Sequence, residues 1–198
     1  MVLNQADRRL MPTVTRITQT LVNLLTSARF VVDGNSMSPA LDNGQWVLAV
    51  RPIRSWNRLR RGDIVVLRHP VWTKRTFIKR IVGLPDEEVC LEGGIVYLNG
   101  VLLEEEYIAA SDSGGLESGS LESGSLESKE VGVNRERHHG EWWNGPEEYF
   151  VLGDNRQDSQ DSRVFGPVDR RLILGRVWFR CWPLRSWGAV PGRRSGSG

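Results

Sequence analysis

An Asn99-Gly100 pair lies between two short apolar runs, and no other feature restricts the fold of this chain as strongly. The runs are residues 95–98 (IVYL) and 101–103 (VLL). Both central positions of a two-residue hairpin turn need positive φ, which Asn and Gly adopt most easily. The pair therefore predicts two antiparallel strands joined by a tight turn.

Short apolar segments rich in β-branched and aromatic residues recur along the rest of the chain, and turn residues separate them. A length of 198 residues fits one domain, with room for an insertion. We predict strands over residues 29–32, 46–50, 63–67, 76–82, 89–91, 149–152 and 172–182. Many short strands and one helical segment predict a mostly-β domain, folded as an antiparallel sheet or a partial barrel with an N-terminal helix.

The helical segment is residues 13–27, in which apolar side chains recur at helical spacing. The stretch between Arg16 and Arg29 is shorter than the ~20 apolar residues that a spanning helix needs. We expect either an amphipathic helix at a membrane interface or a short span within residues 13–32 whose terminal arginines reach the headgroups. The alternative is a soluble helix packed on the domain core.

A repeat with a period of five occupies residues 114–128 (GGLES, GSLES, GSLES). Gly, Ser and Glu bury too little apolar surface to offset their ordering entropy, so we expect a flexible insertion within an irregular stretch at 109–147. The nearby His138-His139 pair is more typical of a solvated loop than of a metal site. The chain thus divides into a helix at 1–29, a folded domain at 30–182 that contains the insertion, and a disordered tail at 183–198.

The charged residues and the cysteines restrict which partners and which catalytic groups this chain can have. The net charge of +2 predicts no nucleic-acid partner. Only three of the 26 basic residues are lysines, namely Lys74, Lys79 and Lys129, and lysine can lose its proton whereas arginine cannot. Cys90 and Cys181 have no metal-binding spacing; we expect buried free thiols, with a disulfide as the alternative.

Ser36 follows an apolar run and a Gly-Asn turn, so its side chain is presented at a surface or a cleft. A serine hydroxyl is a weak nucleophile until a base takes its proton. The histidines fit poorly as that base, because His69 precedes a proline and the other two lie in the insertion. Lys79 lies in a β-branched run, where desolvation lowers its pKa and a neutral amine can act as general base. Taken singly, the serine could be a turn residue and the lysine a solvent-facing strand residue.

Residues 153–163 (GDNRQDSQDSR) gather Asp, Ser and Arg in a loop directly after an apolar strand. Asp161 and Arg163 could form a fixed ion pair. Ser159 could hydrogen-bond a neutral lysine amine and orient it. In isolation the loop could equally be a polar β-turn.

Together these stretches resemble the type I signal peptidases, which are membrane-associated Ser-Lys endopeptidases that remove signal peptides. The resemblance covers most of residues 30–182. It rests on four boxes in order, at residues 34–41 (GNSMSPAL), 61–66 (RGDIVV), 79–85 (KRIVGLP) and 153–163. They are similar to the family's nucleophile, Arg-Gly-Asp, lysine and Gly-Asp-Asn-Arg boxes, and four boxes in this order are specific where one would be weak.

The resemblance implies a role for each candidate residue. Ser36 would be the nucleophile, with its backbone N–H at the oxyanion, and Lys79 the general base. Ser159 would orient the lysine, while Asp161 and Arg163 would brace the site. No metal or cofactor is implied.

The chain departs from the family pattern at two turns. Leu84-Pro85 is followed by Asp86-Glu87 where the family usually has Gly-Asp, and the lost glycine affects the local turn. Some members carry, two residues before the nucleophile, a serine whose hydroxyl helps the oxyanion. This chain has Gly34 there, so the Ser36 N–H would carry more of that role.

The implied activity is removal of N-terminal signal peptides from exported preproteins, at the cell membrane and with the catalytic domain on its extracytoplasmic face. The substrate would add as an extended strand beside the segment before Ser36 and residues 76–79. Small residues such as alanine would precede the cut. Expected partners are signal peptides and the lipid surface. Candidate lipid contacts are Trp142, Trp143, Trp182 and Trp187, with core packing as the alternative for Trp182.

Two other functions stay open. One is a different Ser-Lys peptidase, of the conjugation-pilin processing or self-cleaving repressor type. The self-cleaving type needs a DNA-binding region, for which residues 1–27 are too short. The other is a non-catalytic relative that only binds peptides, which the Ser-Lys pair argues against.

Overall fold

The described strands form two antiparallel sheets, as the succession of short apolar runs and turns predicts. The computed structural model describes residues 26–51, 59–105, 107–108 and 140–190. The main sheet has the order β1 (Ser27–Val31), β2 (Trp46–Val50), β11 (Ile173–Trp182), β3 (Ile64–Arg68), β4 (Thr76–Gly83), β9 (Glu148–Leu152) and β10 (Val168–Asp169). A short β12 (Gly188–Ala189) pairs with β11 outside this path.

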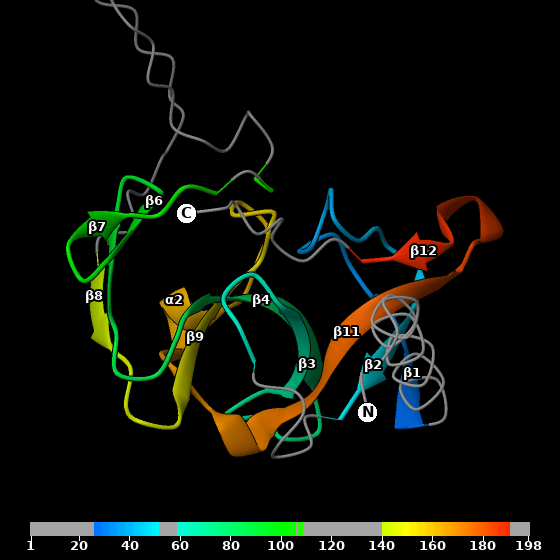
Figure 1. Cartoon of the computed structure of the whole chain (residues 1–198), viewed down its shortest axis with the longest axis horizontal. Helices are drawn as coiled ribbons and strands as arrows, with labels where there is room; N and C mark the ends of the chain where they lie inside the picture. Colours follow the sequence, from blue (N-terminus) through cyan, green and yellow to red (C-terminus); the bar gives the residue numbers. More distant parts are fainter. Residues whose placement is uncertain (1–25, 52–58, 106, 109–139, 191–198) are drawn as a thin grey trace, which may run out of the picture.

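The long strand β11 links the two halves of the main sheet, and in Figure 1 it crosses from the side of β3 to the side of β1 and β2. It pairs with β2 along one edge and with β3 along the other. Register shifts interrupt both pairings, and such bulges bend a strand and increase its twist. The β1–β2 and β3–β4 pairs are therefore joined through a third strand from far along the chain.

A second sheet contains the predicted hairpin. Its order is β7 (Val101–Leu102), β6 (Ile95–Leu98), β5 (Glu88–Glu92) and β8 (Gly140–Trp143). Asn99 and Gly100 have φ of 50° and 77°, so the turn has the two positive φ values that its sequence predicts.

The buried residues explain why the strands near the centre have few polar side chains. β3 has four consecutive buried residues, which is typical of a strand covered on both faces. One apolar cluster joins this strand to the segment that follows β1, through Val66, Val32, Met37 and Leu41. The cluster fixes the β1–β2 connection on the sheet.

Helix is scarce among the described residues. It consists of α2 (Ser162–Phe165) and the 3-10 turns η1 (Arg170–Leu172) and η2 (Leu184–Ser186). The helix expected at residues 13–27 lies outside the described residues, as do the five-residue repeat and His138-His139. No helix in the described ranges has the length and apolar character needed to cross a bilayer.

Two segments that the sequence predicts to be irregular or disordered contain regular structure. β8 lies within the stretch expected to be irregular, because residues 140–143 pair with β5 and the Trp142 ring packs against Phe150 at a centroid distance of 4.9 Å. The described chain also continues past residue 182, and Val190 N donates a hydrogen bond to Trp178 O. Cys90 and Cys181 are free thiols, half-buried rather than buried.

Candidate active site

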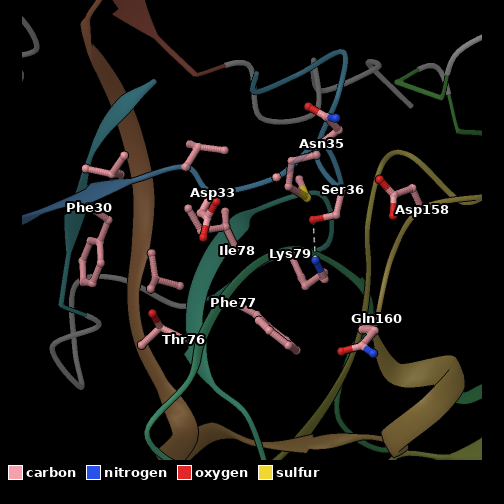
Figure 2. A pocket seen from close by; sticks show the side chains of 15 residues that line it. Phe30, Asp33, Asn35, Ser36, Thr76, Phe77, Ile78, Lys79, Asp158 and Gln160 are labelled. Atoms are coloured by element: carbon pink, nitrogen blue, oxygen red, sulfur yellow. Dashed lines mark hydrogen bonds between the residues drawn. The ribbon is translucent and has the colours of Figure 1, made fainter. Parts of the chain in front are cut away.

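A cleft with a volume of about 330 Å³ lies beside Ser36. Residues 30–37 form one wall, the first half of β4 forms another, and Asp158 and Gln160 approach from the loop of residues 153–163 (Figure 2). The sequence predicted all three segments, and the fold brings them to one place.

Ser36 is held in the β1–β2 connection by its apolar neighbours. Met37 and Leu41 are 1% and 0% exposed, and Leu41 N donates to Met37 O at 2.8 Å. Ser38 N donates to Asn35 O at 3.0 Å, which closes the turn around the serine. Buried anchors on one side leave the Ser36 hydroxyl facing the cleft.

Lys79 Nζ donates a hydrogen bond to Ser36 Oγ at 2.7 Å (Figure 2). The lysine is 3% exposed and lies on β4 opposite Val65 of β3. Burial lowers the pKa of Lys79 to about 8, although the negative charges of Asp161 and Asp154 work in the opposite direction. A substantial fraction of such amines is neutral near pH 8, so this lysine can accept a proton.

The loop of residues 153–163 contacts the serine from the other side. Asn155 N donates to Ser36 O at 3.1 Å, and Gly153 N donates to the Asp161 carboxylate at 3.0 Å. The Arg163 guanidinium makes two hydrogen bonds to the same carboxylate, at 2.8 and 2.9 Å. Burial favours the neutral acid, but these donors outweigh it and hold the pKa of Asp161 below its usual value. The predicted Asp161–Arg163 ion pair is thus present and buried.

Ser159 lies close to the nucleophile but does not make the hydrogen bond expected of it. Its Oγ is buried and makes no hydrogen bond to Lys79, but it interacts with the Asp161 carboxylate and helps to lower the pKa of that group. A Cβ added to Gly153 would lie 2.2 Å from this oxygen and 2.5 Å from Ser36 O, so the two groups flank the same glycine. Only a residue without a side chain fits between them.

A buried ion pair next to Lys79 was not predicted from the sequence. Arg80 donates to the two carboxylate oxygens of Asp154 at 2.7 and 2.6 Å, and to Gly62 O at 2.8 Å. It is the largest side chain among those less than 2% exposed. The pair joins the strand of Lys79 to the loop of residues 153–163. The sequence signal for it was that Arg80 and Asp154 lie in two of the boxes that resemble the family's.

The two departures from the family pattern have local explanations. Asp86, at the position of the missing glycine, has φ of 61°, a left-handed conformation that favours glycine. Glu87 accepts from Leu84 N and from Arg61, which closes this turn. Gly34 has φ of 89°, so a serine there would be strained.

The histidine that the structure describes has another role. His69 is 4% exposed, and its Nδ1 accepts hydrogen bonds from Val71 N and Trp72 N. It packs among the rings of Trp72, Phe77 and Phe165. In the described part of the chain, no three His, Cys, Asp or Glu side chains converge as metal ligands would.

Known proteins resemble this chain over most of its length. The family described as "Signal peptidase, peptidase S26" matches residues 9–182. Signal peptidase I of Bacillus caldolyticus is 33% identical over 84% of this chain and 85% of its own length. That of Leptolyngbya laminosa is 32% identical over 94% and 86%. The crystal structure of a signal peptidase I from Enterococcus faecalis is 28% identical, with a TM-score of 0.46 over 62% of this chain and 98% of that one. The chain therefore belongs to the signal peptidase family, peptidase S26.

Proposed function

We propose that this protein is a signal peptidase, a serine endopeptidase that removes N-terminal signal peptides from exported preproteins, with Ser36 as nucleophile and Lys79 as general base. The relatives named signal peptidase I support the activity. The observation that carries the residue assignment is the 2.7 Å contact between Lys79 Nζ and Ser36 Oγ in an open cleft.

In the first half of the reaction, Ser36 Oγ attacks the scissile carbonyl while neutral Lys79 takes the hydroxyl proton. The carbonyl oxygen becomes an oxyanion, which the Ser36 backbone N–H stabilises; one such donor is typically worth about 3 kcal/mol. Lys79 then gives its proton to the leaving amine, and the C–N bond breaks. The signal peptide remains as an ester on Ser36.

Water completes the cycle. Lys79, neutral again, takes a proton from a water molecule whose oxygen attacks the ester. The ester C–O bond breaks, the proton returns to Ser36 Oγ, and the signal peptide leaves as a carboxylate. One buried amine thus serves as base and acid in both halves.

Ser159, Asp161 and Arg163 support the lysine in this proposal. The Ser159 hydroxyl is buried and makes no hydrogen bond to Lys79, and its interaction with the Asp161 carboxylate helps to lower the pKa of that acid. A hydroxyl that donates to a carboxylate can still accept a hydrogen bond, so its oxygen can receive one from the Lys79 amine when acylation removes the Ser36 hydroxyl. Arg163 and Gly153 N–H fix the Asp161 carboxylate, which holds the loop around Ser159.

The cleft fits an extended peptide. Its walls come from the end of β1 with the residues that follow and from the start of β4, so backbone groups lie on both sides of the space (Figure 2). Phe30, Val32, Met37 and Ile78 supply apolar lining of this cleft. We expect small side chains before the cut, as the family resemblance implies, in contact with these apolar residues.

The catalytic domain also has an apolar patch that suits a lipid surface. Trp46 lies between Val31 of β1 and Trp182 of β11, and Arg29 stacks on its ring. Val31, Trp182 and Trp187 are 56%, 50% and 61% exposed. Exposed tryptophans beside arginine suit the headgroup region of a bilayer. We propose that this Trp46 patch faces the lipid, on the extracytoplasmic side of the membrane.

The test is cleavage of a fluorogenic signal peptide by the purified protein. Ser36→Ala and Lys79→Ala should each abolish cleavage. Lys79→Arg should be equally inactive, because a guanidinium cannot serve as base. Lys74→Ala is the matched control, since Lys74 is exposed and outside the cleft. An active Lys79→Arg variant would rule out the dyad.

A further inference from the structure

A buried charged cluster that takes no part in the cleavage steps lies beside the loop of residues 153–163. Glu105 Oε1 accepts hydrogen bonds from Arg156 Nη2 at 2.5 Å and from the Tyr107 hydroxyl at 2.6 Å. The charged side chains of Glu105 and Arg156 are each 7% exposed. Burying such a pair often costs as much free energy as it gains, so stability alone is a poor explanation for it.

Tyr107 connects this cluster to the strand that carries Lys79. Its ring lies over the guanidinium of Arg80 at 4.1 Å, and Arg80 directly follows the lysine on β4. Burial and the neighbouring Glu105 charge raise the pKa of Tyr107, so the phenol remains a hydrogen-bond donor at working pH. One short segment thus contacts both β4 and the loop.

Arg156, which is paired with Glu105, also bonds to the loop backbone. Its Nε donates to Gly153 O at 3.1 Å. In the residues just before Arg156, Asn155 N donates to Ser36 O and Gly153 N donates to the Asp161 carboxylate. Arg156 is therefore one of the residues that hold the loop against the nucleophile, together with the Arg80–Asp154 and Arg163–Asp161 ion pairs.

We propose that Glu105 is a positioning residue of the peptidase reaction, which fixes the loop of residues 153–163 against Ser36 through Arg156. The proposal rests on the proposed function of the Ser36 site. Glu105 does not line the cleft, so its loss should affect the chemical steps rather than peptide binding. A loosened loop would admit water to Lys79, and hydration would raise the pKa of that amine towards its ordinary value.

The decisive variant is Glu105→Gln, with Glu104→Gln as its control. Glu104 is exposed and directly precedes Glu105, so the control removes the same charge from the same segment. Cleavage of a fluorogenic signal peptide is followed from pH 6 to pH 10. Glu105→Gln should lower kcat at least tenfold with KM within twofold, and its activity should rise at higher pH than that of the wild type. Glu104→Gln should match the wild type.

Tyr107→Phe is the second variant. It keeps the ring over Arg80 and removes only the hydrogen bond to Glu105, so it should change kcat and the pH profile in the same direction but less. If Glu105→Gln does not fold, Tyr107→Phe tests the positioning role of Glu105 in its place. Rates are normalised to the active enzyme, counted by an acylating reagent that labels Ser36.

Three outcomes are distinguishable. A normalised kcat and pH profile like those of Glu104→Gln would overturn the proposal. So would a loss of activity that disappears on normalisation, because Glu105 would then serve stability alone. If the wild type itself does not cleave, or Ser36→Ala cleaves equally well, the proposed function fails instead.

Discussion

A lysine that is 3% exposed costs the fold free energy whenever it is protonated. Burial lowers the pKa of Lys79 from 10.5 to about 8, a shift that corresponds to about 3 kcal/mol. Because the folded-state pKa is the lower one, the cost is complete below pH 8 and disappears as the pH rises past 10.5. The same burial that makes this amine a base therefore destabilises the protein at neutral pH.

Replacing the lysine should separate the two effects. We expect Lys79→Met to be inactive but more stable than the wild type at pH 7, by up to about 3 kcal/mol, with a smaller gap at pH 10. Urea denaturation at both pH values measures the gap. Lys74→Met, at an exposed position, should show no such dependence. A gap for Lys79→Met that is equal at the two pH values would contradict the burial argument.

At the residue scale, the sequence predicted the positions that lie in local patterns. Ser36 and Lys79 each follow an apolar run within a recognisable box, and the structure brings them within 2.7 Å. Glu105 was not predicted, because one acid among three consecutive glutamates is typical of a solvated surface. Its partner Arg156 is 51 residues away, and no local pattern encodes a contact at that separation.

The loop of residues 153–163 has no space for a side chain at Gly153. We expect Gly153→Ala to lower kcat at least tenfold, because the new methyl group would collide with Ser159 Oγ and with the backbone oxygen of Ser36. Gly145→Ala is the control, since its methyl group would meet only the flexible end of Glu148. Kinetics of both variants on one peptide test this, and a fully active Gly153→Ala would show that the loop can shift without cost to catalysis.

The turn between β4 and β5 holds strain that a substitution can relieve. Asp86 has φ of 61°, and a left-handed conformation costs a non-glycine residue about 1–2 kcal/mol. After the greater flexibility of glycine in the unfolded chain is subtracted, Asp86→Gly should stabilise the protein by about 1 kcal/mol. Thermal unfolding measures the change. Asp86→Ala should bring no gain, and equal shifts for the two variants would rule out backbone strain as the cause.

The elements themselves were largely predictable. Strands with β-branched runs and turn residues at their ends were found within one or two residues, among them β2, β4 and β6. β8 was not, because it follows a polar segment and is held by pairing with β5, some 50 residues earlier. The mostly-β antiparallel fold follows from the local runs, whereas the order of strands in each sheet depends on such distant pairings.

On the scale of the whole molecule, the tryptophans divide between two surfaces. Trp182 pairs with Trp46, and Trp187 packs against Phe179 of the same strand, β11, whereas Trp143 is 64% exposed on the second sheet and Trp142 packs against the core. With vesicles that contain brominated lipid, Trp182→Phe and Trp187→Phe should reduce the quenching of protein fluorescence. Trp143→Phe should leave the quenched component unchanged. If all three variants behave alike, the patch does not face lipid.

The pairing of β11 has a consequence for the order in which the enzyme is made. The segments that carry Ser36 and Lys79 emerge early, but among the described strands β2 and β3 are linked in the sheet through β11, at residues 173–182. A growing chain therefore has both reactive side chains long before it has the strand that aligns them. We therefore expect incomplete chains to be inactive, because the active site can assemble only after residues 173–182 have been synthesised.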